Sequence, residues 1–270
     1  MKLWDKPGTM LLRISAVLVI AFFVASPLHR SAVTATLLPK SGFTPAQDAR
    51  VLAQAGAQAV AQRVSQHLAA SLAQLQSMQG ASVDKPFNVY VFASEDDYTG
   101  LGACPPGSRA CAFRGHLSVS PRLANELPTV PAILTHELSH VLMQQRMGHW
   151  ASSQIPPWFA EGLAVMVSDG GGAEDIGTQE VAASLAAGQH FTPHLEGSLL
   201  RPRTADYFKL PHRLFYRQSA AFVIYLKQQH PTHFSDLLLR MHAGMQFEAA
   251  FGKAFMQPIA TLWAQFLQNP

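Results

Sequence analysis

Two histidines and a glutamate have the spacing in this chain that best suits chemistry. The run from 135 to 140 reads T-H-E-L-S-H, so His136 and His140 stand four residues apart, with Glu137 between them. On a helix, positions i and i+4 lie on one face, and both imidazoles can therefore reach one metal ion. Glu137 lies beside them, where it can act as a general base on a metal-bound water. This H-E-x-x-H pattern is the sequence signature of zinc-dependent hydrolases.

A third metal ligand must come from outside this pattern, because catalytic zinc holds three protein ligands and one water. Met143 and Arg146 stand at the offsets where metzincins have Gly and His, so that class is excluded. Downstream, the apolar run P-P-W-F-A-E-G-L-A carries a single carboxylate, Glu161. A lone carboxylate in a buried helix is costly unless it is paired or binds a metal. Glu161 is therefore the candidate third ligand.

The two motifs together, H-E-L-S-H and W-F-A-E-G-L-A, resemble the gluzincin metallopeptidases, specifically a small bacterial group with a W-F-x-E-G-x-A ligand helix. The resemblance extends over roughly residues 40–268. It implies an α+β, mainly helical zincin-like domain with a small N-terminal β-sheet and a C-terminal helical bundle. It also implies one Zn²⁺ per chain and a peptide or polypeptide substrate that pairs with a strand bordering the cleft.

A hydroxyl or cationic donor often stabilises the oxyanion formed during such hydrolysis. The candidates here are Tyr207, His212, Arg213 and Tyr216. The resemblance favours Tyr216 as a catalytic residue, and a purely structural tyrosine is the alternative. Asp169 is a candidate to orient a ligand histidine through a hydrogen bond, and a turn residue is again the alternative.

The composition suits a globular exported protein. Of 270 residues, 48% are hydrophobic and 14% are charged, and the net charge is +3. We find no nucleic-acid-binding motif and expect no nucleic-acid partner. Basic residues precede an apolar run from Ile14 to Ala25, which is typical of a signal peptide or a marginal membrane anchor. We therefore divide the chain into a targeting segment with its linker, 1–35, and a metallopeptidase domain, 36–270. The domain is expected in the periplasm, either free or anchored in the inner membrane.

The two cysteines, Cys104 and Cys111, enclose a turn-rich loop. In an oxidising compartment this spacing favours a local disulfide. A zinc-binding pair or two free thiols are the alternatives.

The coarse pattern predicts the elements that position these residues. We expect a helix from Thr44-Pro45 to about Met78, strands at 86–93 and 112–120, a short helix starting near Ser94, the H-E-x-x-H helix at 129–147, a mostly irregular segment at 175–213, and three or four helices from Tyr216 onward.

The leading functional hypothesis is an exported zinc metallopeptidase. A non-catalytic zinc-containing binding or assembly factor with the same fold is the alternative, although such a factor would not need Glu137. A metal-dependent hydrolase of non-peptide bonds is a third, because fold does not fix substrate.

Overall fold

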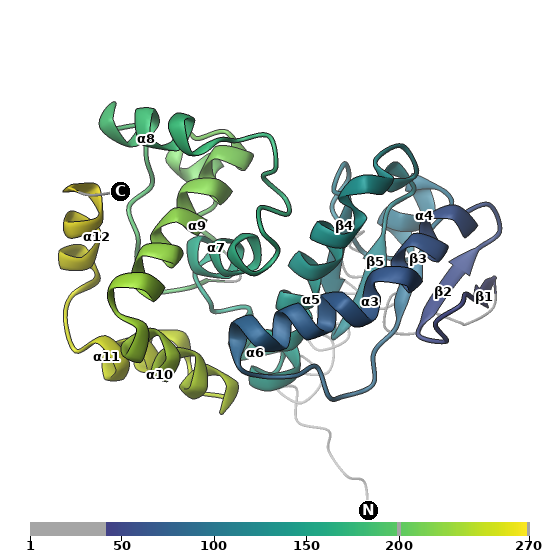
Figure 1. Cartoon of the computed structure of the whole chain (residues 1–270), viewed down its shortest axis with the longest axis horizontal. Helices are drawn as coiled ribbons and strands as arrows, with labels where there is room; N and C mark the ends of the chain where they lie inside the picture. Colours follow the sequence, from purple (N-terminus) through teal and green to yellow (C-terminus); the bar gives the residue numbers. More distant parts are fainter. Residues whose placement is uncertain (1–41, 199–200, 269–270) are drawn as a thin grey trace, which may run out of the picture.

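The computed structural model describes residues 42–198 and 201–268. These residues form an α+β protein with a small sheet in the N-terminal half and helices in the C-terminal half (Figure 1). The expected targeting segment at 1–35 lies outside the described residues. Across the two described ranges, none of the helices combines the length and hydrophobicity that a membrane span requires.

The five-stranded sheet has the strand order β1-β2-β3-β5-β4. The pairs β2–β3 and β3–β5 are parallel, and the outer pairs β1–β2 and β5–β4 are antiparallel. Helix α3 connects β2 to its parallel neighbour β3. Strand β4 is therefore an edge strand, and it lies next to α5 (Figure 1). The bounds are Phe43–Pro45 (β1), Val51–Gln54 (β2), Gln58–Gln79 (α3), Val89–Val91 (β3), Glu95–Gly100 (α4), Ala110–Phe113 (β4) and His116–Val119 (β5).

The helix predicted to begin at Thr44 is wrong at its start. Thr44 lies in β1, the chain turns at Asp48, and it returns as β2 before α3 begins at Gln58. The Asp48 carboxylate accepts the Arg50 backbone N–H at 3.0 Å in this turn. Residues 51–53 are buried because they pair with β3, about 40 residues later, and this long-range pairing overrides the local helical pattern.

The buried face of α3 carries Val60, Val64, Leu68 and Leu75. The strand expected at 86–93 is confirmed over the shorter range of β3. The helix expected near Ser94 is also confirmed as α4, with the Ser94 hydroxyl accepting the backbone N–H of Asp97 at 3.2 Å.

The single strand predicted at 112–120 is in fact a hairpin of β4 and β5. Arg114 and Gly115 form its two-residue turn, and both have positive φ, 49° and 78°. His116, the first residue of β5, accepts the backbone N–H of Asn88 on its ring Nδ1 at 3.0 Å. Sequence reasoning missed this turn because arginine is uncommon at positive φ.

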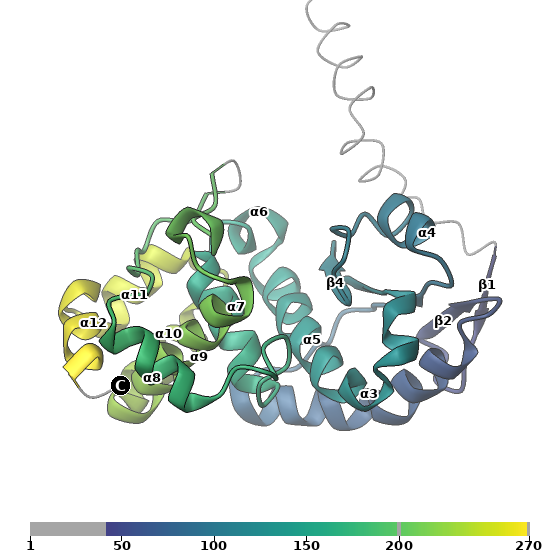
Figure 2. The ribbon, with the colours of Figure 1, turned by 90° about the horizontal axis from the view of Figure 1, so that it is seen from above.

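Helices predominate in the rest of the described chain, with irregular segments at 168–177, 187–198 and 201–205, and they surround α7 (Figure 2). Helix α7 packs along α9, and Gly162 permits the close approach: a Cβ there would lie 2.6 Å from the Ser219 carbonyl oxygen. Helix α9 begins at His212, one turn before the predicted start at Tyr216. The bounds are Pro121–Asn125 (η1), Leu127–Thr129 (η2), Val130–Met147 (α5), His149–Ser152 (α6), Pro157–Val167 (α7), Thr178–Ala186 (α8), Asp206–Phe208 (η3), His212–Gln229 (α9), Pro231–His242 (α10), Phe247–Phe255 (α11) and Ile259–Gln268 (α12).

Candidate metal site

Helix α5 carries both histidines of the site. Its predicted extent is confirmed, with a proline in the first turn and Gly148 just past the last turn. One face of α5 is fixed in the core by residues such as Leu138 and Leu142, which are completely buried. The spacing of four residues then brings the rings of His136 and His140 together, and their Nε2 atoms are 3.2 Å apart.

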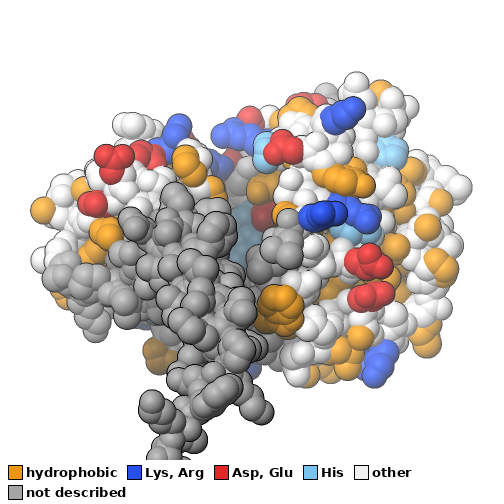
Figure 3. Space-filling model, turned by 180° about the vertical axis from the view of Figure 1, so that it is seen from behind, with side chains coloured by type: hydrophobic (Ala, Val, Ile, Leu, Met, Phe, Trp, Pro, Cys, Tyr) orange, Lys and Arg blue, Asp and Glu red, His pale blue; other side chains and the backbone are white. Residues whose placement is uncertain are grey.

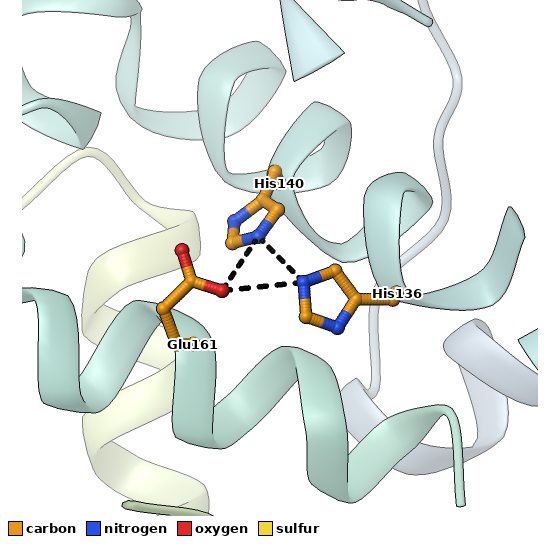
Figure 4. Close-up of side chains that lie close together, drawn as sticks. All are labelled: His136, His140 and Glu161. Atoms are coloured by element: carbon orange, nitrogen blue, oxygen red, sulfur yellow. Dashed lines mark hydrogen bonds and ion pairs between the residues drawn. The ribbon is translucent and has the colours of Figure 1, made fainter. Parts of the chain in front are cut away.

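Helix α7 brings the third candidate ligand to these rings. Trp158 and Phe159 are completely buried at the start of α7, and the Trp158 indole N–H donates to the His194 carbonyl at 2.7 Å. The helix is thereby fixed with Glu161 facing α5. The Glu161 Oε2 atom lies 3.2 Å from the Nε2 of His136 and 3.7 Å from the Nε2 of His140. Figure 4 shows these three atoms pointing toward one another.

The donor set fits a divalent metal such as zinc. The three ligand atoms all lie within 4.8 Å of one another. Zinc bonds of about 2.0–2.1 Å at tetrahedral angles place ligand atoms about 3.3 Å apart, which is close to the observed spacing. The Glu161 Oε2 atom is buried and accepts no hydrogen bond of good geometry. A buried carboxylate oxygen with no hydrogen-bond donor is costly, and a cation held between the two rings would remove that cost.

A backbone carbonyl orients one of the histidines. The Gly171 carbonyl oxygen lies 2.8 Å from His136 Nδ1. Because a carbonyl can only accept, Nδ1 carries the proton, and Nε2 directs its lone pair toward the other two ligand atoms. This arrangement is the usual second hydrogen bond of a metal-binding histidine.

The loop after α7 is shaped by its glycines. Gly170 and Gly172 have φ of +100° and +94°, and a Cβ at Gly171 would lie 2.5 Å from the Ala132 carbonyl oxygen. The sequence made Asp169 the candidate to orient a ligand histidine, with a turn residue as the alternative. Asp169 is instead a turn residue with φ of 55°, and Gly171 makes the contact. The sequence signal for this loop was the run of three glycines that begins three residues after the end of α7.

Glu137 and the edge strand β4 form the wall beside the three ligands. Burial is the main influence on the Glu137 carboxyl and raises its pKa, whereas the neighbouring histidines and the Ala112 backbone act to lower it. Gln144 fastens β4 to α5: its side chain donates to the Ala112 carbonyl at 3.1 Å and accepts the Gly115 N–H at 2.8 Å. Gln144 lies one turn after His140 on the same helix face, and sequence reasoning missed it.

The remaining charges of the site favour a bound cation. Burial disfavours the imidazolium of His140, but the negative charges of Glu161 and Glu137 raise the pKa of His140 to about 9. Burial acts to raise the pKa of Glu161, yet the positive charge of His140 holds it well below its usual range. The pocket therefore stabilises one positive charge beside Glu161, and a metal ion would take the place of that proton.

Tyr216 lies at the site, in the second turn of α9. Its ring stacks on His136 with centroids 6.3 Å apart and an interplanar angle of 19°. The charge of Glu161, followed by burial, raises the pKa of Tyr216 well above its ordinary value. Its hydroxyl is therefore protonated at neutral pH and available as a hydrogen-bond donor.

The other oxyanion candidates differ in position. His212 and Arg213 line the same cleft, and Arg213 is paired with Asp175 at 2.8 Å. Tyr207 does not line it; this exposed side chain lies under the guanidinium of Arg203, 5.6 Å from the ring centroid.

The three candidate ligands open into a cleft of about 1120 Å³. Its walls come from the 105–111 loop, β4, α5, α6, α7 and the start of α9. Histidine side chains are visible deep in the hollow between the two halves of the molecule (Figure 3). The predicted disulfide between Cys104 and Cys111 is confirmed, with Cα atoms 5.8 Å apart, and it closes the 105–111 loop at the cleft wall. Such a bond indicates an oxidising compartment.

Comparisons with known proteins add no functional assignment. No protein-family model matches the chain, and no curated protein matches it. The geometry of the site and its chemistry therefore carry the functional argument.

Proposed function

We propose that this protein is an exported zinc metallopeptidase of the gluzincin type, working in the periplasm or at the inner membrane. The observation that carries the proposal is the group of His136, His140 and Glu161, whose ligand atoms lie within 4.8 Å of one another at the base of an open cleft. In the described residues this group has three members, which is the number of protein ligands in catalytic zinc sites.

When bound, zinc would polarise the scissile carbonyl and lower the pKa of a water molecule. The chain's own residues supply the remaining steps. Glu137 accepts the proton of the attacking water and then delivers it to the leaving amine, which requires a carboxyl that is buried beside the reaction centre but still opens to the cleft. The Tyr216 hydroxyl donates a hydrogen bond to the oxyanion that develops on the former carbonyl oxygen.

The edge strand supports a peptide as the substrate. Arg109 and Ser120 form a hydrogen-bonded pair, since the Ser120 N–H donates to the Arg109 carbonyl at 2.9 Å. Along an antiparallel ladder, hydrogen-bonded pairs alternate with pairs that do not bond each other. Ala110 and Ala112 are in the second kind of pair, so their backbone N–H and C=O groups point away from β5. Gln144 engages the Ala112 carbonyl, and the Ala110 backbone is left for strand addition by an extended peptide.

The test combines metal content with proteolysis. Full-length wild-type protein is expected to contain about one zinc per chain and to cleave a labelled, unfolded protein. Glu161→Ala should lose the zinc. Glu137→Gln should keep the zinc and lose about 10²–10⁴-fold in cleavage rate, because only the proton carrier is removed. Glu180→Gln, an exposed carboxylate on α8, serves as the control and should match the wild type.

Two results would contradict the proposal in different ways. A wild-type protein that binds no zinc, even after reconstitution, would refute the metal site. A zinc-loaded wild type that cleaves no unfolded protein would favour the binding or assembly factor instead.

A further inference from the structure

The loop that orients His136 is itself linked to the 105–111 loop, which also lines the cleft. The Gly171 carbonyl accepts a hydrogen bond from the Nδ1–H of His136, and the backbone N–H of the neighbouring Gly172 donates to Glu174 Oε1 at 3.1 Å. The other oxygen of that carboxylate, Oε2, accepts from Arg109 at 2.9 Å. Arg109 belongs to the disulfide-closed loop next to β4, 65 residues away in sequence.

Arg109 is built into this position. Its side chain is only 13% exposed, and its guanidinium bridges two carboxylates, with Nη2 on Glu174 and Nη1 on Glu126 at 3.2 Å. The planar fork of arginine can hold both at once, which a lysine ammonium on a flexible stem does poorly. Burial of the guanidinium costs desolvation free energy, and the pairing with Glu126 and Glu174 offsets that cost.

We propose that Arg109 and Glu174 are positioning residues for the metal site. Together they hold the Gly170–Gly172 loop against His136, so that the Gly171 carbonyl keeps the proton on Nδ1 and Nε2 faces the other ligands. This inference rests on the proposed function, because it assigns these two residues to the same zinc site.

The two carboxylates paired with Arg109 allow a matched comparison, Glu174→Gln against Glu126→Gln, with Glu174→Ala as the stronger variant. Glu174→Ala removes both the ion pair and the acceptor for Gly172. Glu174→Gln removes the ion pair but keeps an oxygen that can accept the Gly172 N–H. Glu126→Gln removes the other ion pair of the same guanidinium without touching the glycine loop.

The readouts are zinc affinity, measured by competition with a chelator, and the visible absorption spectrum of the Co²⁺-substituted protein, which reports ligand geometry. Both use the full-length protein, and neither depends on peptidase activity. Substitution of residues that hydrogen-bond to metal ligands typically costs 10–100-fold in metal affinity. Glu174 contacts Gly172, next to the Gly171 that bonds His136, and not the histidine itself. We therefore expect a loss at the lower end, about tenfold, for Glu174→Ala. The cobalt spectrum should change with it.

Glu174→Gln should give a smaller loss of the same kind and keeps the proposal testable if the alanine variant fails to fold. Glu126→Gln should keep wild-type affinity and spectrum. Equal zinc affinities for Glu174→Ala, Glu126→Gln and the wild type would overturn the positioning role while leaving the zinc site intact. A wild type that binds no zinc would overturn the proposed function and this inference with it.

Discussion

Replacing Gly162 with alanine tests whether the contact between α7 and α9 positions Glu161, the third candidate metal ligand. A Cβ at Gly162 would lie 2.6 Å from the Ser219 carbonyl oxygen and 2.9 Å from a methyl of Val223. Ordinary contacts begin at 3.4 Å, so the two helices would have to separate by about 0.8 Å. The carbonyl belongs to the backbone of α9 and cannot rotate away.

The expected free-energy change follows from two opposing effects. Overpacking of a well-packed contact costs about 1–3 kcal/mol, and a backbone clash belongs at the upper end. Alanine also stabilises the helix by about 1 kcal/mol relative to glycine, because it has the higher helix propensity. The net loss of unfolding free energy should be about 2 kcal/mol. For a chain of this size that lowers Tm by about 4–8 °C.

The assay is thermal and urea unfolding with a chelator present, so that metal binding adds nothing to stability. Gly252→Ala is the control: Gly252 lies in α11 with nothing within 4 Å of the added Cβ. It should gain about 0.5–1 kcal/mol. A Gly162→Ala protein that is as stable as the wild type, or that gains stability as the control does, would refute the reasoning. Zinc affinity should also fall in Gly162→Ala, because Glu161 moves with α7.

Three further predictions concern other parts of the chain. Tyr216→Phe should retain its zinc and lose about 10²-fold or more in kcat with little change in KM, as steady-state kinetics would measure; an unchanged kcat would leave Tyr216 a packing residue. His242 has its pKa lowered to about 4, mainly by burial and also by Arg146, so the stability it contributes is complete above its unfolded pKa near 6.5 and is lost as the pH falls toward 4. The Tm of the wild type should therefore fall more steeply between pH 7 and 4 than that of His242→Gln, and parallel curves would contradict this. Replacing both Cys104 and Cys111 with serine should lower the unfolding free energy by about 2–3 kcal/mol. A reductant should lower the Tm of the wild type but not of that variant; a wild-type Tm indifferent to reductant would count against the disulfide's role.

Local pattern was sufficient where an element is defined by its own periodicity. The H-E-x-x-H helix, the buried P-P-W-F-A-E helix and the short helix after Ser94 lie where the sequence predicted them. The prediction was wrong where strand pairing between residues far apart in sequence determines the secondary structure. Thr44 and Pro45 suit the start of a helix, but β2 pairs with β3 and draws the preceding chain into a hairpin. The β4–β5 turn was missed because it uses Arg114 at positive φ.

The sequence by itself determined which side chains could bind a metal, because i,i+4 spacing places His136 and His140 on one helix face and a lone carboxylate in an apolar helix requires a partner. Only the tertiary structure decided that Glu161 lies 3.2 Å from His136, since that distance depends on how α7 packs against α5 and α9. It alone revealed the support from Gly171, Glu174 and Arg109. Those contacts join residues 35 to 65 positions apart, and no local pattern encodes such separations.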